Sequence, residues 1–269
     1  RQMCIRDRDW KRSFGDHNLT AMAMYMMREY RSDVLPNRNQ GYSGRVTYDY
    51  ASKYLVEFNF GYNGSERLAA GQRFEFFPAV SAGWVASSEK FWEPISKYIN
   101  HFKIRGSYGL VGSDAFASGA PHFLYQNNIG IGSAHKFWTG LPTSEISKQG
   151  PGFYVLAVQD AGWEHVKKFD IGFDMMLFNQ LNITFDYFHD KRERILMSRA
   201  SWPSMLGYWG SKPWSNIGEV ENQGFELSLN WTKQFGKDLT LDLRGNFTYN
   251  QNEYKYVDEP SYPYVWQTN

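Results

Sequence analysis

The chain has 269 residues and a formal net charge of +1, and 18 % of its residues are aromatic. A net charge near zero gives no electrostatic reason to expect a nucleic-acid partner. No apolar run approaches the roughly 18 residues of a membrane-spanning helix, which excludes a helical membrane protein. A mean hydropathy of -0.57 is still compatible with membrane strands, because their alternating apolar and polar residues average out polar.

The first segment, RQMCIRDR at residues 1–8, resembles translated sequencing-adapter sequence. Its crowded charges fit no pattern that follows, so we expect residues 1–8 to be an artefact and leave them out of the fold prediction. Residues 9–269 are then the domain whose fold is predicted. Cys4 is the single cysteine, and one thiol predicts no internal disulfide.

Alternation with a period of two residues is the main structural signal. In KYLVEFNFGYN at 53–63, Tyr54, Val56 and Phe58 share one face, and Leu55, Glu57 and Asn59 share the other. Such alternation predicts a strand with one apolar face, and it recurs in 101–112, 181–190 and 239–250. These runs are longer than the typical 5–6 residues of soluble strands and fit the roughly 9–11 residues of a tilted membrane strand.

The pattern predicts about nine strands in all. Their ranges are 17–29, 42–50, 53–63, 73–86, 101–112, 166–177, 181–193, 222–232 and 239–250. The connections alternate in length: 50–52, 178–180 and 233–238 are short, whereas 113–165 and 194–221 are long. Residues 87–100 are intermediate, with a helical turn expected around 89–98.

This alternation separates the two all-β architectures that the composition allows. Short turns on one side and long loops on the other are expected of an up-and-down membrane barrel, and a Greek-key sandwich has no reason to produce them. The predicted fold is therefore all-β, a partial antiparallel transmembrane barrel. Nine strands would not close it, and an open edge does not stand in lipid, so the fragment should not fold or transport alone.

Aromatic residues gather near the ends of the predicted strands, as the girdles of a membrane barrel would require, although β-propensity alone also favours them there. Others lie in the long loops, where flat rings suit stacking on sugars or on apolar side chains of a peptide. These candidate binding residues are Phe137, Trp138, Trp202, Tyr208, Trp209 and Trp214. Packing between loops, or onto a partner, is the alternative role.

Four segments together resemble a known family. They are RFEFFPAVSAGWVASSEKFW at 73–92, FKIRGSYGLVGSD at 102–114, WEHVKKFDIGFDMMLFNQLNITFDYFHDKRERIL at 163–196 and NIGEVENQGFELSLNW at 216–231. In this order they resemble the SusC/RagA-type TonB-dependent transporters of Bacteroidetes. The resemblance implies an outer-membrane barrel of about 22 strands with an N-terminal plug. It also implies two protein partners, a SusD-like surface lipoprotein and TonB, and a cargo of oligosaccharide or peptide. No plug and no TonB-contacting segment are present.

Several histidines and carboxylates could be catalytic or metal-binding residues, or could simply be solvated side chains on strands. No pair of the six histidines has ligand spacing such as HxxxH or HxH, so we expect no metal site and no cofactor. Asp186, His189 and Asp190 end an alternating strand, where solvated groups are expected. Glu219, Glu221 and Glu226 could suggest a glycosidase pair, whose required separation the sequence does not show. We expect no catalytic residue.

The predicted function is therefore import of a bulky nutrient across the outer membrane, not catalysis. The alternatives are a secreted carbohydrate-binding or glycan-cleaving β-protein and a passive porin or adhesin barrel. Lipid offers charges no solvation, so charged and polar groups are expected on the lumen face. Lipid-facing positions are Val56, Phe58, Ile104, Ile183, Phe185, Leu227, Leu229 and Leu241; lumen-facing positions are Glu57, Asn59, Lys103, Arg105, Asp186, Glu226, Asp242 and Arg244.

Overall fold

The computed structural model describes residues 2–31, 36–116, 120–139, 146–203, 205, 212–236 and 239–260. Of residues 2, 132–139, 146–149 and 153 it describes the backbone alone. Within these ranges no helix is long or apolar enough to cross a membrane.

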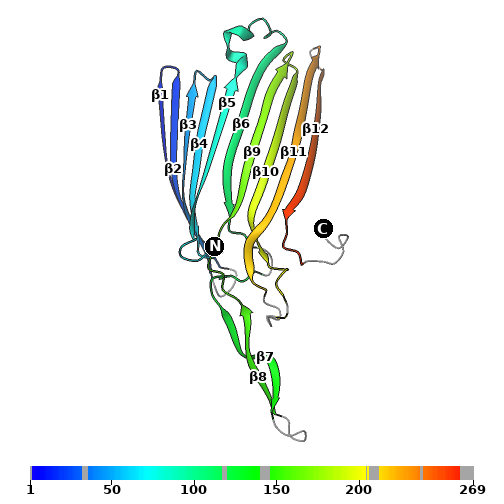
Figure 1. Cartoon of the computed structure of the whole chain (residues 1–269). Helices are drawn as coiled ribbons and strands as arrows, with labels where there is room; N and C mark the ends of the chain where they lie inside the picture. The colour runs from blue at the N-terminus through cyan, green and yellow to red at the C-terminus, as the bar shows by residue number, and fades with distance from the viewer. Residues whose placement is uncertain are drawn as a thin grey trace.

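Ten strands form one antiparallel sheet in which each strand pairs with the next along the chain (Figure 1). They are β1 (Gln2–Phe14), β2 (His17–Arg31), β3 (Pro36–Tyr50), β4 (Tyr54–Ser65), β5 (Phe74–Val85), β6 (Ile99–Ser113), β9 (Glu164–Leu177), β10 (Leu181–Ser198), β11 (Trp214–Phe235) and β12 (Leu239–Tyr256). Among the described residues, β1 and β12 pair on one side only, so the sheet is not closed. The up-and-down architecture expected from the sequence is confirmed.

Short connections lie together at one end of the sheet and long ones at the other (Figure 1). The turns at 50–53 and 177–180 each close with a backbone hydrogen bond and hold both central residues at positive φ, as in type I′ hairpins. The intermediate connection contains two short 3₁₀ turns, η1 (Ala86–Ser88) and η2 (Lys90–Trp92), close to the expected helical turn.

Three strands, β1 and the two strands of a separate hairpin, were not predicted from the period-two pattern. β1 covers residues that the sequence analysis set aside or left unassigned, and it pairs with β2 over its whole length without any apolar alternation. The long connection after β6 contains a separate hairpin of β7 (Asn128–Thr139) and β8 (Ile146–Val155), which projects away from the sheet (Figure 1). Their sequences lack a sustained period-two apolar pattern, so side-chain alternation does not reveal them.

Several strands also run further toward the long-loop end than predicted. β3 begins at Pro36, β10 continues to Ser198 and β12 continues to Tyr256. The connection expected at 194–221 is therefore partly strand. A bulge at Arg194, whose φ is positive, interrupts the side-chain alternation there and hides the continuation.

The register sorts the side chains of β9–β12 into rows that cross all four strands. On one face, four successive rows are apolar apart from Gly245: Leu177–Leu181–Trp231–Leu243, Met175–Ile183–Leu229–Gly245, Phe173–Phe185–Leu227–Phe247 and Ile171–Tyr187–Phe225–Tyr249. Phe58 continues this face on β4 and is 43 % exposed. No second sheet packs on the ten strands within the described ranges, so this apolar face is uncovered.

The buried core lies among the long connections, where they meet the sheet. One cluster joins Leu68, Phe77 and Trp163, and a second joins Leu124, Ala161 and Leu196. Phe116 packs against both clusters. The Trp163 indole N–H also donates to the carbonyl of Arg73 at 3.0 Å. These loops are therefore packed against each other, which gives the long-loop end a defined shape.

Candidate functional site

The polar face of the sheet carries most of the site residues expected from the sequence. Its rows in β9–β12 include Asp174–Thr184–Ser228–Asn246, Gly172–Asp186–Glu226–Thr248 and Asp170–Phe188–Gly224–Asn250. The register places all eight expected lumen positions on this face, from Glu57 and Asn59 on β4 to Asp242 and Arg244 on β12. The eight expected lipid positions share the opposite, apolar face.

Arg105 is the centre of an ionic cluster that joins three strands. From β6 its guanidinium lies 2.7 Å from the Asp186 carboxylate on β10 and 3.2 Å from that of Asp174 on β9. Asp170 on β9 lies 3.8 Å away. Only Arg105 and Asp186 were singled out from the sequence; Asp170 and Asp174 continue the same period-two pattern on β9 and could have been found from it.

Gly172 makes the contact between Arg105 and Asp186, two strands apart, possible. It sits on β9 directly between Arg105 and Asp186, since the register pairs it with both. A Cβ at this position would collide with the Asp186 carboxylate and with the carbonyl of Phe185. The glycine therefore opens a passage across β9 through which an arginine reaches the second strand along.

The remaining expected lumen residues form smaller groups. Asn59 donates to Glu57 at 2.6 Å and accepts from Arg45 at 3.0 Å. Asp242 accepts a hydrogen bond from the Thr232 hydroxyl at 2.6 Å. The side chains of three others make no hydrogen bond or ion pair with the part of the chain that the structure describes: Lys103, Glu226 and Arg244.

The structure describes the side chains of two of the six candidate loop aromatics, Trp202 and Trp214. Trp214 is half-buried at the start of β11 and packs against the cluster of Leu124, Ala161 and Leu196. Trp202 is half-buried, and its backbone N–H donates to the carbonyl of Arg199 at 3.4 Å. Tyr208 and Trp209 lie outside the described residues, and of Phe137 and Trp138 only the backbone is described, in β7.

A buried carboxylate, which the sequence analysis did not single out, ties two long connections together. Asp258 follows β12 and accepts hydrogen bonds from the Ser201 N–H at 3.0 Å and the Ser201 hydroxyl at 2.8 Å. Arg199 reaches it at 3.3 Å. Burial would raise the pKa of Asp258, but the bonds from Ser201 and the charge of Arg199 outweigh it and hold the pKa below its usual value.

The catalytic groupings weighed from the sequence do not converge. His189 lies on the apolar side of β10, whereas Asp186 and Asp190 lie on the polar side. Glu226 faces the polar side of β11, opposite to Glu219 and Glu221, because alternate residues of a strand point to opposite faces. Among the described residues there is also no group of three or more His, Cys, Asp or Glu placed to hold a metal ion.

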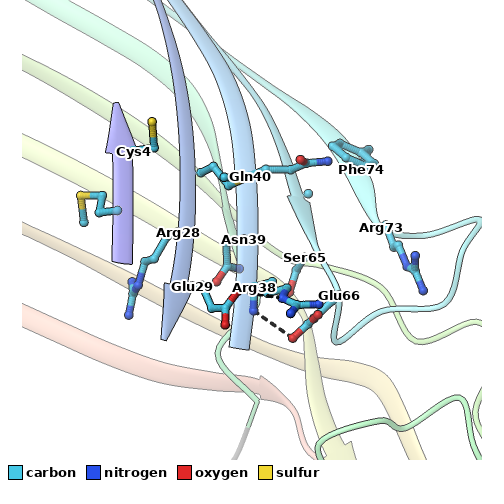
Figure 2. A pocket seen from close by; sticks show the side chains of 13 residues that line it. Cys4, Arg28, Glu29, Arg38, Asn39, Gln40, Ser65, Glu66, Arg73 and Phe74 are labelled. Atoms are coloured by element: carbon cyan, nitrogen blue, oxygen red, sulfur yellow. Dashed lines mark hydrogen bonds and ion pairs between the residues drawn. The ribbon is translucent and has the colours of Figure 1, made fainter. Parts of the chain in front are cut away.

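A hollow of about 710 Å³ lies at the long-loop end of β1–β5 (Figure 2). Arg38 donates through its side chain to Glu29 of the neighbouring strand at 3.1 Å, and its backbone N–H donates to the Glu66 carboxylate at 2.9 Å. Met3 and Cys4 of β1 form one wall of it. The hollow therefore depends on residues 1–8, which are expected to be an artefact.

One face that is apolar over four rows and an opposite face of paired charges and amides define the wall of a transmembrane β-barrel. A family model described as "TonB dependent receptor-like, beta-barrel" matches residues 6–265. The chain belongs to this TonB-dependent receptor family and is located in the outer membrane. The family consists of receptors and transporters, not enzymes.

Relatives and solved structures agree with this assignment. TonB-dependent receptor P3 of Formosa agariphila is 31 % identical over 211 residues, which are 78 % of this chain and 20 % of that protein. TonB-dependent receptor SusC of Bacteroides thetaiotaomicron is 26 % identical over 239 residues, 84 % of this chain and 22 % of that protein. The chain thus spans about a fifth of the length of the curated relatives that it matches.

The fold matches solved transporters at low identity. The RagAB peptide importer in its "closed-closed" state gives a TM-score of 0.75 at 18 % identity, covering 94 % of this chain and 30 % of that chain. The siderophore receptor PirA of Acinetobacter baumannii gives 0.60 at 12 %, covering 96 % of this chain and 37 % of that chain. These likenesses support the barrel fold.

The passage at Gly172 leads to a first prediction. In the full-length protein, Gly172→Ala should displace the Asp186 carboxylate and lower stability by about 1–3 kcal/mol, the usual cost of overpacking. Thermal unfolding of the purified barrel measures this. Gly106→Ala is the matched control on β6, because a Cβ there meets only a backbone oxygen at ordinary contact distance. Equal unfolding temperatures for the two variants would contradict the role given to Gly172.

Proposed function

We propose that the full-length protein imports a bulky nutrient, a glycan or an oligopeptide, through the outer membrane with energy from TonB and with a SusD-like surface lipoprotein. The observation that carries this proposal is the two-faced sheet of a family whose members are TonB-dependent receptors. The fold shared with the RagAB peptide importer favours a peptide as cargo. The sequence similarity to TonB-dependent receptor SusC supports a role that depends on TonB.

The polar face is proposed to line the lumen or to face the plug. Supporting this, the face holds the cluster of Arg105 with Asp170, Asp174 and Asp186, which lipid would not solvate. We further propose that the loop aromatics other than Trp214 contact the cargo, since Trp214 packs against a buried cluster. No catalytic role is proposed, because the candidate carboxylates are divided between the two faces.

Gene deletion tests the transport proposal. Deleting the full-length gene should abolish growth on one member of a panel of oligosaccharides and peptide mixtures supplied as sole nutrient, and the intact gene should restore it. Trp202→Ala should raise the nutrient concentration that supports half-maximal growth. Growth that persists when TonB is inactivated would indicate a passive porin, and cleavage of the nutrient by the purified protein would indicate an enzyme. A SusD-like gene next to this one is the expected genomic context.

Neighbouring positions on β10 test the assignment of the faces. Phe185→Arg should cost roughly 2–4 kcal/mol near the middle of the membrane, whereas Asp186→Asn should cost far less because it faces water or the plug. Single cysteines at these positions give the direct measurement in intact outer membranes. A water-soluble maleimide should label position 186 and miss position 185. Labelling of 185 with protection of 186 would reverse the faces, and equal labelling of both would mean that β10 is not a membrane strand.

The register of β1 supports the proposal that residues 1–8 are an artefact. Arg6 pairs with Tyr25 and Arg8 with Ala23, so both arginines lie on the apolar face of the sheet. An arginine facing lipid costs about 2–4 kcal/mol near the midplane. We therefore propose that residues 1–8 do not belong to the native wall. Amplifying and sequencing the genomic locus should give an alternating apolar segment in their place; codons for RQMCIRDR in frame at that locus would refute this.

A further inference from the structure

The apolar face of β9–β12 changes abruptly toward the long-loop end. Beyond the row that contains Tyr187, Phe225 and Tyr249, the register gives the row Phe169–His189–Gln223–Gln251 and then the row Lys167–Lys191–Glu221–Glu253. Glu193 and Glu219 follow on the same face by strand alternation. Lys255 lies at a register shift of β12 and is placed beside them by its ion pair with Glu221. A belt of charged side chains thus borders the apolar band directly, on the same side of the sheet.

The charges of this belt are linked across four strands. Lys167 of β9 lies 2.6 Å from Glu193, and Lys191 lies 2.7 Å from the same carboxylate. On β11, Glu221 pairs with His189 at 2.7 Å and with Lys255 of β12 at 2.9 Å. The carboxylates hold the three lysine ammonium groups, which come from β9, β10 and β12, beside the apolar band.

We infer that this ionic belt, made of Lys167, His189, Lys191, Glu193, Glu219, Glu221, Glu253 and Lys255, binds the phosphate groups of lipid headgroups in the outer leaflet. The inference rests on the proposed assignment of the apolar face to lipid. The ligand is inferred from the position of the belt. The belt continues the apolar face toward the long-loop end, so beside the hydrocarbon layer it meets the lipid headgroups.

The chemistry of the belt suits a phosphate. An ammonium group carries three N–H donors, and Lys167 uses one on Glu193, which leaves donors for a ligand. The side chains of Lys167, Lys191 and Lys255 keep 43 %, 37 % and 37 % of their surface exposed. Each of the four glutamates is paired with a lysine, so no unpaired carboxylate of the belt stands among the ammonium groups to repel an anion.

The adjacent lysine provides a matched control. Lys168 follows Lys167 in the chain but lies on the polar face of β9, where it pairs with Asp190 at 3.5 Å. It has the same charge and nearly the same position along the strand. Only the face differs, so a headgroup site predicts opposite outcomes for the two residues.

The test uses the full-length protein, purified and delipidated in detergent, with lipopolysaccharide as the probe. The double variant Lys167→Gln/Lys191→Gln should bind it about tenfold more weakly or worse, since charge-assisted hydrogen bonds are lost, and Lys168→Gln should bind like the wild type. Dephosphorylated lipopolysaccharide should bind the wild type as weakly as the intact probe binds the double variant. Heat-modifiable migration on gels confirms that each variant is folded.

The results that would contradict the phosphate site differ from those that would contradict the proposed transport function. Unchanged affinity in the double variant, or no effect of dephosphorylation, would overturn the belt as a phosphate site. Complete competition by inorganic phosphate at millimolar concentration would overturn the lipid as its source. Reversed labelling at positions 185 and 186 would instead overturn the assignment of the faces. Loss of TonB-dependent growth concerns the proposed function alone.

Discussion

A peptide group inside the hydrocarbon of a membrane has no water to bond with, and each unpaired N–H or C=O there costs several kcal/mol. Every strand of the ten-stranded sheet from β2 to β11 meets this requirement by pairing on both sides. β1 and β12 do not, since each has one free edge among the described residues. Because edges cannot stand in lipid, the remaining strands of the longer protein must supply partners for them.

The same constraint divides the side chains between two faces. Because the backbone groups are paired, the four apolar rows of β9–β12 can meet lipid, and along these rows the charged side chains lie on the other face. There the charges still need partners, and Arg105 obtains them from β9 and β10 through the gap left by Gly172. A missing side chain thus decides how far an ionic cluster spreads across the wall.

At the long-loop end the protein leaves the membrane, and it is held by different interactions. Buried apolar clusters around Trp163 and Leu196 pack the connections together, and Asp258 joins the segment after β12 to the β10–β11 connection. The strands themselves continue past the apolar band into the ionic belt. These features make the outer end of the sheet a shaped surface, on which the β7–β8 hairpin stands.

The amino-acid sequence by itself determined the all-β class, the up-and-down order and the two faces. Alternation at positions such as Val56 to Phe58 and Ile183 to Phe185 follows directly from the two-residue period of a strand, so no tertiary information was needed. Tertiary structure alone decided which residues meet across strands. The sequence does not distinguish Gly172 from other strand glycines, and only the register places it between Arg105 and Asp186. The sequence likewise does not show that Trp214 packs against a buried cluster. The strands β1, β7 and β8 were not predicted, because their sequences lack a sustained period-two apolar pattern. Alternation is a local property of the chain, whereas register and loop packing depend on segments far apart in it, and only the folded sheet brings them together.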